Sequence, residues 1–126
     1  MKNLIIQENK QPYIPYINFD ASTGKCIISG ESYPENAFDF YASLTSWIKE
    51  YFDSGKETLQ LTIDLSYFNT STASAMIIFF ETLKVFQDKG KQLLVEWEYE
   101  DIDGKEEGES FAMDTEIKMT VKEKKS

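Results

Sequence analysis

The sequence predicts an α/β domain: a mixed sheet of four to five strands with helices packed mainly on one face. Residues 59–66 and 92–100 alternate apolar and polar side chains, which is typical of strands with one buried and one solvated face. Residues 71–88 between them are apolar at helical spacing. A strand covered by helices on both faces would be apolar throughout, so we expect one helical layer.

Length and composition indicate one globular domain over residues 1–126, with an ordered core at about 10–122. The formal net charge is −9, from 22 acidic and 13 basic residues, which disfavours binding to nucleic acid or to an anionic membrane. The single cysteine, Cys26, cannot form an internal disulfide and is expected to be buried. No segment resembles a signal peptide or is long enough to span a bilayer, so we expect a cytoplasmic protein.

Histidine is absent, which excludes zinc sites of the usual type and nucleophile systems that depend on histidine. The acidic run at 96–103 lacks the spacing of a calcium-binding EF-hand loop and is typical of a solvated face. These residues give no basis for a metal site; the expectation that the protein is not an enzyme and has no cofactor comes instead from a family resemblance carried by other residues of the chain.

The first part of the chain is predicted to form a hairpin. Residues 1–10 are expected to fray apart from Leu4, Ile5 and Ile6. Residues 13–19 are aromatic and β-branched and contain Pro15, which predicts a strand at a sheet edge. A turn at 20–24 then leads to a return strand at 25–29.

A first helix is predicted over residues 34–52. Ser32 and Glu35 have the spacing of a capping box, and Pro34 suits the first helical turn. Gly55 is typical of a helix end.

The second half is predicted to begin with a right-handed strand–helix–strand unit with parallel strands, made by 59–66, 71–88 and 92–100. After it we expect an acidic solvated loop at 101–109, a short helical turn near 110–113 and a last strand at 118–122.

The corner between the second strand and the second helix carries the candidate site. Asn69, Thr70, Ser71 and Thr72 follow the strand directly and open the helix. One of them is needed as a helix cap, but a cap does not require all four. Unpaired N–H groups at a helix N-terminus favour negative charge, including phosphate. The corner therefore indicates either a cap alone or a phosphorylated hydroxyl, with Thr70 at its centre.

These residues resemble a known family. The segment Asp64-Leu65-Ser66-Tyr67-Phe68-Asn69-Thr70-Ser71 looks like the phosphorylation segment of STAS-type anti-sigma-factor antagonists. The closer resemblance is to the SiaC family of bacterial regulatory phosphoproteins, through two motifs: Gly30-Glu31-Ser32-Tyr33-Pro34-Glu35-Asn36 and Tyr67-Phe68-Asn69-Thr70-Ser71. The order of elements also fits over about residues 10–100.

The resemblance implies a STAS-like fold and phosphorylation of Thr70, the threonine after the asparagine. It also implies a partner switch that involves a cognate Ser/Thr kinase, a PP2C-type phosphatase and a diguanylate cyclase in biofilm-type c-di-GMP signalling. The unmodified form would bind the cyclase and raise its output. Asn69 stands where the antagonists carry aspartate, so anti-sigma function is the alternative, followed by a small-ligand-binding domain or an enzyme.

Partner contacts are expected around Thr70, from Asn69, Ser71 and Thr72. Tyr33 and Asn36 could join them, because both helix N-termini could lie at one end of the sheet. For these two residues a purely structural role at the helix start remains an equal alternative.

Overall fold

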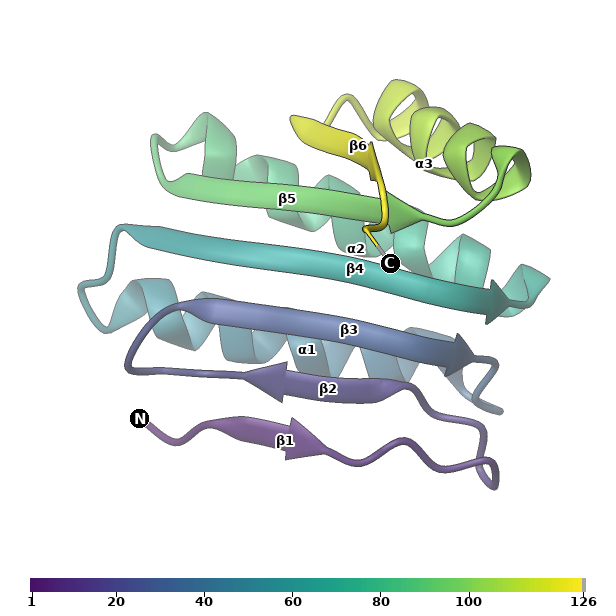
Figure 1. The fold of residues 1–126 in the computed structure, drawn as a ribbon. Helices are drawn as coiled ribbons and strands as arrows, with labels where there is room; N and C mark the ends of the chain where they lie inside the picture. The colour runs from purple at the N-terminus through teal and green to yellow at the C-terminus, as the bar shows by residue number, and fades with distance from the viewer. Residues whose placement is uncertain (126) are drawn as a thin grey trace.

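A mixed sheet of six strands forms the centre of the computed structural model, which describes residues 1–125 (Figure 1). The strands are β1 (Leu4–Ile6), β2 (Tyr16–Phe19), β3 (Lys25–Ser32), β4 (Thr58–Phe68), β5 (Gln92–Tyr99) and β6 (Met119–Glu123). They lie in chain order across the sheet; β1, β2 and β3 pair antiparallel, and β3 to β6 pair parallel. The predicted α/β class is confirmed, with six strands in place of four or five.

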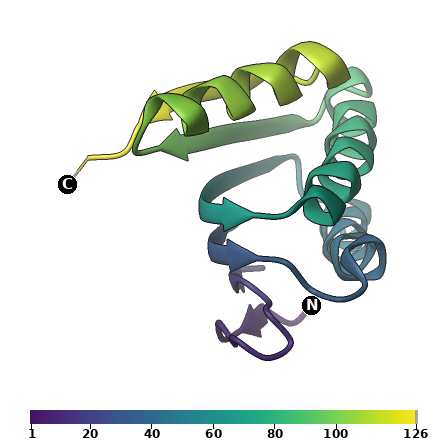
Figure 2. The same ribbon diagram turned by 90° about the vertical axis from the view of Figure 1, so that its right-hand side faces the viewer.

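Three helices connect the parallel strands: α1 (Ala37–Asp53), α2 (Thr70–Asp88) and α3 (Ile102–Thr115). α1 and α2 lie behind the sheet in Figure 1, and α3 covers β5 and β6 (Figure 2). The ring of Phe111 on α3 lies 5.4 Å from the rings of both Phe80 on α2 and Trp97 on β5, measured between centroids. The helices therefore share one core on one face of the sheet, as predicted.

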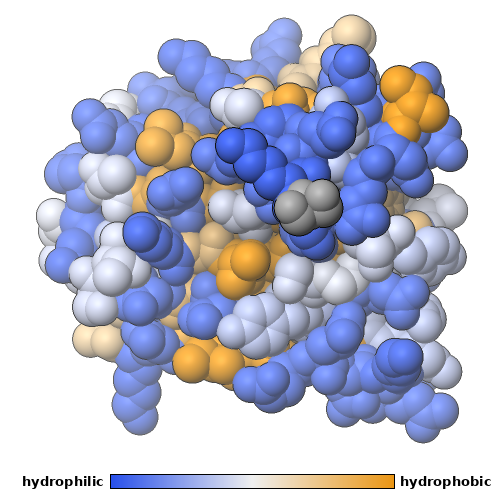
Figure 3. Space-filling model, in the orientation of Figure 1, coloured by the Kyte–Doolittle hydropathy of each residue, from blue (hydrophilic) through white to orange (hydrophobic). Residues whose placement is uncertain are grey.

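The other face of the sheet is solvated. Figure 3 shows it as mostly hydrophilic, with small hydrophobic areas. Ion pairs cross it, among them Lys124 Nζ at 2.7 Å from Asp64 Oδ2 and Lys122 Nζ at 2.8 Å from Glu96 Oε2. This is the polar face that the alternation in β4 and β5 predicts.

The N-terminal part differs from the prediction: the strand expected at 13–19 begins only at Tyr16, and the return strand expected at 25–29 continues to Ser32. β2 and β3 form the predicted hairpin, but β1 pairs with the outer side of β2, so β2 is not an edge strand. Pro15 precedes β2, where its missing N–H removes no bond from the sheet. β1 also adds an ordered strand before the predicted core at 10–122.

The strand–helix–strand unit made by β4, α2 and β5 is confirmed with parallel strands, and α2 begins one residue earlier than predicted. The last strand, β6, is also confirmed within one residue.

The acidic segment after β5 is a full helix, so the prediction of a loop at 101–109 with a short turn at 110–113 is wrong. Asp101 caps α3 by accepting a hydrogen bond from Gly104 N at 2.9 Å. Trp97 Nε1 donates to Gly104 O at 2.9 Å, and Gly108 packs against the Trp97 ring. Tertiary packing against Trp97 therefore stabilises a helix that its two glycines disfavour.

Candidate functional site

The site lies where the parallel strands β3 and β4 end and the helices α1 and α2 begin, at the right of Figure 1. β4 ends at Phe68, and Asn69 is the N-cap of α2. Asn69 Oδ1 accepts a hydrogen bond from Thr72 N at 2.9 Å, and Asn69 N donates to Ser32 O at 3.3 Å. The predicted capping role is thus filled by Asn69, which leaves the hydroxyl residues after it free for other roles.

Thr70 is the first residue of α2, and its side chain is exposed, as is that of Ser71. Helix geometry gives the N–H groups of these two residues no acceptor within the helix. The first turn of α2 contains no acidic side chain. An incoming anion would therefore meet unpaired amides and the positive end of the helix dipole.

The start of α1 differs from the prediction. Asn36 is the N-cap: its Oδ1 accepts a hydrogen bond from Asp39 N at 3.1 Å, and its Nδ2 donates to Asp39 Oδ2 at 2.8 Å. The predicted capping box of Ser32 and Glu35 is wrong, because Ser32 is the last residue of β3 and is fully buried. The exposed Asn36 thus has a structural role at the edge that also carries Thr70.

Three buried hydroxyls connect the ends of these elements. Ser32 Oγ lies 2.8 Å from Tyr41 Oη on α1 and 3.2 Å from Thr72 Oγ1 on α2. Thr72 Oγ1 donates to Ser32 O at 2.9 Å. Burial raises the pKa of Tyr41 to about 12, so its phenol stays protonated. The cluster holds both helix N-termini against the end of β3.

The same contacts correct one predicted partner-contact residue. Thr72 is fully buried, so its side chain is not on the surface that a partner could reach. Asn69 and Tyr33 are half-buried, and Ser71 and Asn36 are exposed. In the sequence Thr72 has the same polar character as its neighbours; only the packing against Ser32 separates them.

Thr72→Val is expected to destabilise the fold by about 1–2 kcal/mol, because Val keeps the shape but removes a buried donor. The matched control is Thr82→Val on the same helix, whose hydroxyl donates only to Ile78 O at 2.9 Å within α2. That control should cost less than about 0.5 kcal/mol. Urea unfolding of both variants measures the difference; equal losses would show that the hydroxyl cluster adds no stability.

An aromatic cluster that the sequence did not predict lies at this edge. The ring of Tyr33 stacks on Tyr13 with centroids 4.5 Å apart and meets Tyr67 edge-on at 5.5 Å. The β3–β4 register shifts between Gly30 and Glu31, so Tyr67 pairs with Glu31 beside the Tyr33 ring. Burial raises the pKa of Tyr33, and the nearby charge of Glu31 raises this pKa further. Tyr67 is 51% exposed and extends the polar corner with an aromatic surface.

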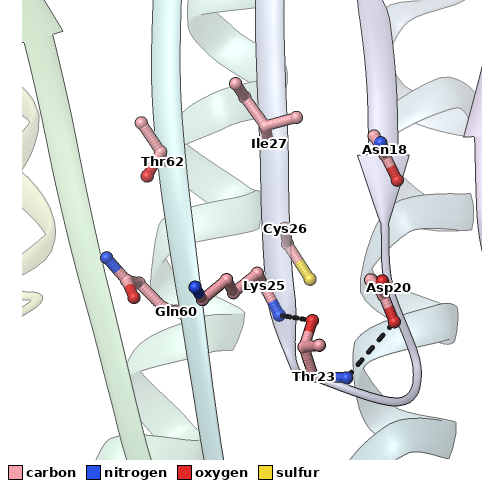
Figure 4. Close-up of a pocket in the computed structure, with 8 residues that line it drawn as sticks. All are labelled: Asn18, Asp20, Thr23, Lys25, Cys26, Ile27, Gln60 and Thr62. Atoms are coloured by element: carbon pink, nitrogen blue, oxygen red, sulfur yellow. Dashed lines mark hydrogen bonds between the residues drawn. The ribbon is translucent and has the colours of Figure 1, made fainter.

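A cavity of about 440 Å³ lies at the other end of β3 and β4, away from this site (Figure 4). It is lined by Asn18, Asp20, Thr23, Lys25, Cys26, Ile27, Gln60 and Thr62. Two of its polar side chains belong to the β2–β3 turn: Thr23 N donates to Asp20 Oδ1 and Lys25 N donates to Thr23 Oγ1, both at 3.2 Å. Cys26 is buried as predicted, and burial raises its thiol pKa to about 12, which makes it a poor nucleophile.

Within residues 1–125, no three His, Cys, Asp or Glu side chains are placed to hold a metal ion. In the same part of the chain, no helix combines the length and the apolar character that crossing a membrane requires.

Most of this chain matches a known protein family. The family model for the SiaC family regulatory phosphoproteins matches residues 6–124. An uncharacterized protein of Pseudomonas aeruginosa strain UCBPP-PA14 is 29% identical over 86 residues, which are 68% of each chain.

Solved structures of SiaC from Pseudomonas aeruginosa are also similar. Apo-SiaC has a TM-score of 0.85 at 26% identity, covering 97% of this chain and 99% of its own. A crystal structure of the diguanylate cyclase SiaD in complex with its activator SiaC matches with a TM-score of 0.84 at 25% identity, covering 96% and 99%. The family match extends beyond the range that the two motifs suggest and includes α3 and β6. The chain therefore belongs to the SiaC family of regulatory phosphoproteins.

Proposed function

We propose that this protein is a non-enzymatic partner switch controlled by phosphorylation of Thr70. In the unmodified form it binds and activates a diguanylate cyclase. A cognate Ser/Thr kinase adds the phosphate and a PP2C-type phosphatase removes it. The switch operates in the cytoplasm, the compartment that contains the GTP consumed by such a cyclase.

The observation that carries the proposal is that Thr70, a hydroxyl residue at the first position of α2, is exposed. A kinase can reach it without opening the core. The phosphate would add roughly −1.5 to −2 charge at neutral pH and three acceptor oxygens. The helix N-terminus favours this charge, so the fold tolerates the modification.

The surroundings of Thr70 support a change at the surface without a large internal movement. The elements behind it are tied by the buried contacts of Ser32 with Tyr41 and Thr72. The first turn of α2 carries no acidic residue, so the phosphate would add negative charge to a helix start that has none of its own. A partner that packs closely against Thr70 and Ser71 would then lose affinity.

The cyclase as output partner is supported by the SiaC relative, which is the activator of SiaD in the solved complex. We propose that the contact surface includes Asn69, Ser71, Tyr33 and Asn36 around Thr70. These four side chains are at least partly accessible and lie at the same edge of the sheet.

Intact-mass analysis tests the modification. Protein purified from its own host should contain a species heavier by one phosphoryl group, and treatment with a PP2C-type phosphatase should remove it. Fragmentation should place the group on Thr70, and Thr70→Ala should lack it. A phosphoryl group found on another residue, with Thr70 unmodified, would contradict the proposal.

A further inference from the structure

A groove lies between α2 and α3, and the proposed switch at Thr70 gives it no role. It encloses about 600 Å³. Its apolar floor consists of Phe68, Ala73, Ile77 and Phe111. Phe111 is buried, and the other three remain partly accessible, so the floor is open to an incoming apolar group.

The α3 side of the groove is a wall of carboxylates: Asp103, Glu106, Glu107 and Asp114 line it together with Ser110. Residues 103, 107, 110 and 114 follow the i, i+4, i+7, i+11 spacing of one helix face. Burial raises the pKa of Glu107, and the nearby charges of Asp101 and Asp103 raise it further. A cation placed along this wall would relieve that repulsion.

The α2 side of the groove is neutral and apolar. Ala73 and Ile77 follow Thr70 at i+3 and i+7, so Thr70 lies on the same line of α2, one turn before the groove begins. The groove thus combines an apolar floor, to which α2 contributes Ala73 and Ile77, with one acidic side along α3.

We propose that this groove binds an amphipathic helix of a protein partner, whose apolar face covers Phe68, Ala73 and Ile77 and whose lysine or arginine side chains face the α3 carboxylates. Helix-in-groove recognition uses apolar anchors at helical spacing, and the acidic wall selects a cationic flank. α3 has 14 residues, so about four turns of the partner helix can lie along it.

This proposal does not depend on modification of Thr70. A phosphate at Thr70 would extend the negative charge at the end of the groove, so binding of a cationic helix should not weaken. The proposed cyclase contact, in contrast, should weaken. Each of the two proposals can therefore be refuted without refuting the other.

The test uses two synthetic peptides of about 15 residues, which is long enough to cover α3. Both carry leucine on one helical face; one has lysine on the flank and the other has glutamate. Binding to the full ¹⁵N-labelled chain is followed by NMR. The lysine peptide should shift the amide signals of 73–77 and 103–114 and bind at least about tenfold more tightly than the glutamate peptide.

Variants separate groove binding from general attraction to an acidic protein. Ile77→Asn should lower the affinity for the lysine peptide about tenfold, because the substitution removes an apolar anchor from the groove. Ile78→Asn is the matched control: Ile78 is the next residue of α2, is 53% exposed and does not line the groove, so affinity should not change.

A charge pair completes the design. The double variant Glu106→Gln, Asp114→Asn removes two charges from the groove and should weaken binding of the lysine peptide several-fold. The control double variant Glu35→Gln, Glu50→Gln changes the net charge by the same amount at exposed sites near or on α1, so the affinity should not change. Equal losses in the two double variants, equal losses for Ile77→Asn and Ile78→Asn, or shifts outside the groove would overturn the proposal.

Discussion

Thr70→Asp is expected to weaken binding of the cognate diguanylate cyclase by at least about tenfold, which corresponds to ~1.4 kcal/mol. The aspartate places a charge at the start of α2, on a surface where the first helical turn has no acidic residue. A partner packed closely there must either leave this charge unpaired or lose part of the contact. Thr70→Ala adds no charge to this surface, so it should lose much less affinity than Thr70→Asp.

The variant itself should fold normally. An acidic side chain in the first turn of a helix is favourable by about 0.3–1 kcal/mol, so the melting temperature should be unchanged or slightly higher. This separates the expected loss of binding from a loss of structure, because both variants can be compared by circular dichroism before the binding measurement.

Isothermal titration with the purified cyclase measures the effect. The matched control is Thr120→Asp, which adds the same charge at an exposed site on β6 and should leave the affinity unchanged. If Thr70→Asp and Thr70→Ala bound the cyclase equally well, the switch at Thr70 would be wrong. If Thr120→Asp weakened binding as much as Thr70→Asp, the effect would be one of net charge.

The elements around Thr70 could be predicted from the sequence because their signals are local. β4 has a clear period of two, α2 is long and apolar, and the polar residues between them are typical of a helix start. The parallel arrangement then follows from the strand–helix–strand order. The different exposure of Thr70 and Thr72 could not be predicted in this way, because only the packing against Ser32 shows that Thr72 is buried.

What could not be predicted depends on contacts between distant segments. Ser32 looks like a helix cap in the sequence, and only its pairing with Phe68 of β4 and its buried contacts with Tyr41 and Thr72 show that it ends a strand. The stacking of Tyr33 on Tyr13 depends on how the chain before β2 folds back, since Tyr33 N donates to Tyr13 O at 3.0 Å. Tyr67 belongs to a recognisable motif, but its edge-on contact depends on the register of β3 and β4.

α3 is the clearest failure of local signals, and it leads to the second large effect. Its sequence is acidic and contains Gly104 and Gly108, so propensity and periodicity both favour a loop. The helix forms because Gly108 lets it lie directly against the Trp97 ring. Gly108 is therefore a requirement of packing and not a sign of flexibility.

Gly108→Ala is expected to destabilise the protein by about 1–3 kcal/mol, although alanine at an ordinary helix position would stabilise by up to about 1 kcal/mol. The added Cβ would overlap Trp97 Cδ1 and lie 2.8 Å from both Cγ and Nε1 of that ring. To relieve this overlap, α3 or the Trp97 indole must move, and the movement would strain the 2.9 Å hydrogen bond from Trp97 Nε1 to Gly104 O. Urea unfolding should show the loss as a lower midpoint with an unchanged slope.

The sign of the effect distinguishes packing from propensity, so the control must report propensity alone. Glu109→Ala, at the next and exposed position of α3, should be neutral or slightly stabilising. A double-mutant cycle with Trp97→Phe then tests the cause. The smaller ring should tolerate the added Cβ better, so the double variant should lose less stability than the sum of the two single losses. Stabilisation by Gly108→Ala, or strict additivity in the cycle, would mean that the Trp97 contact does not determine the residue at position 108.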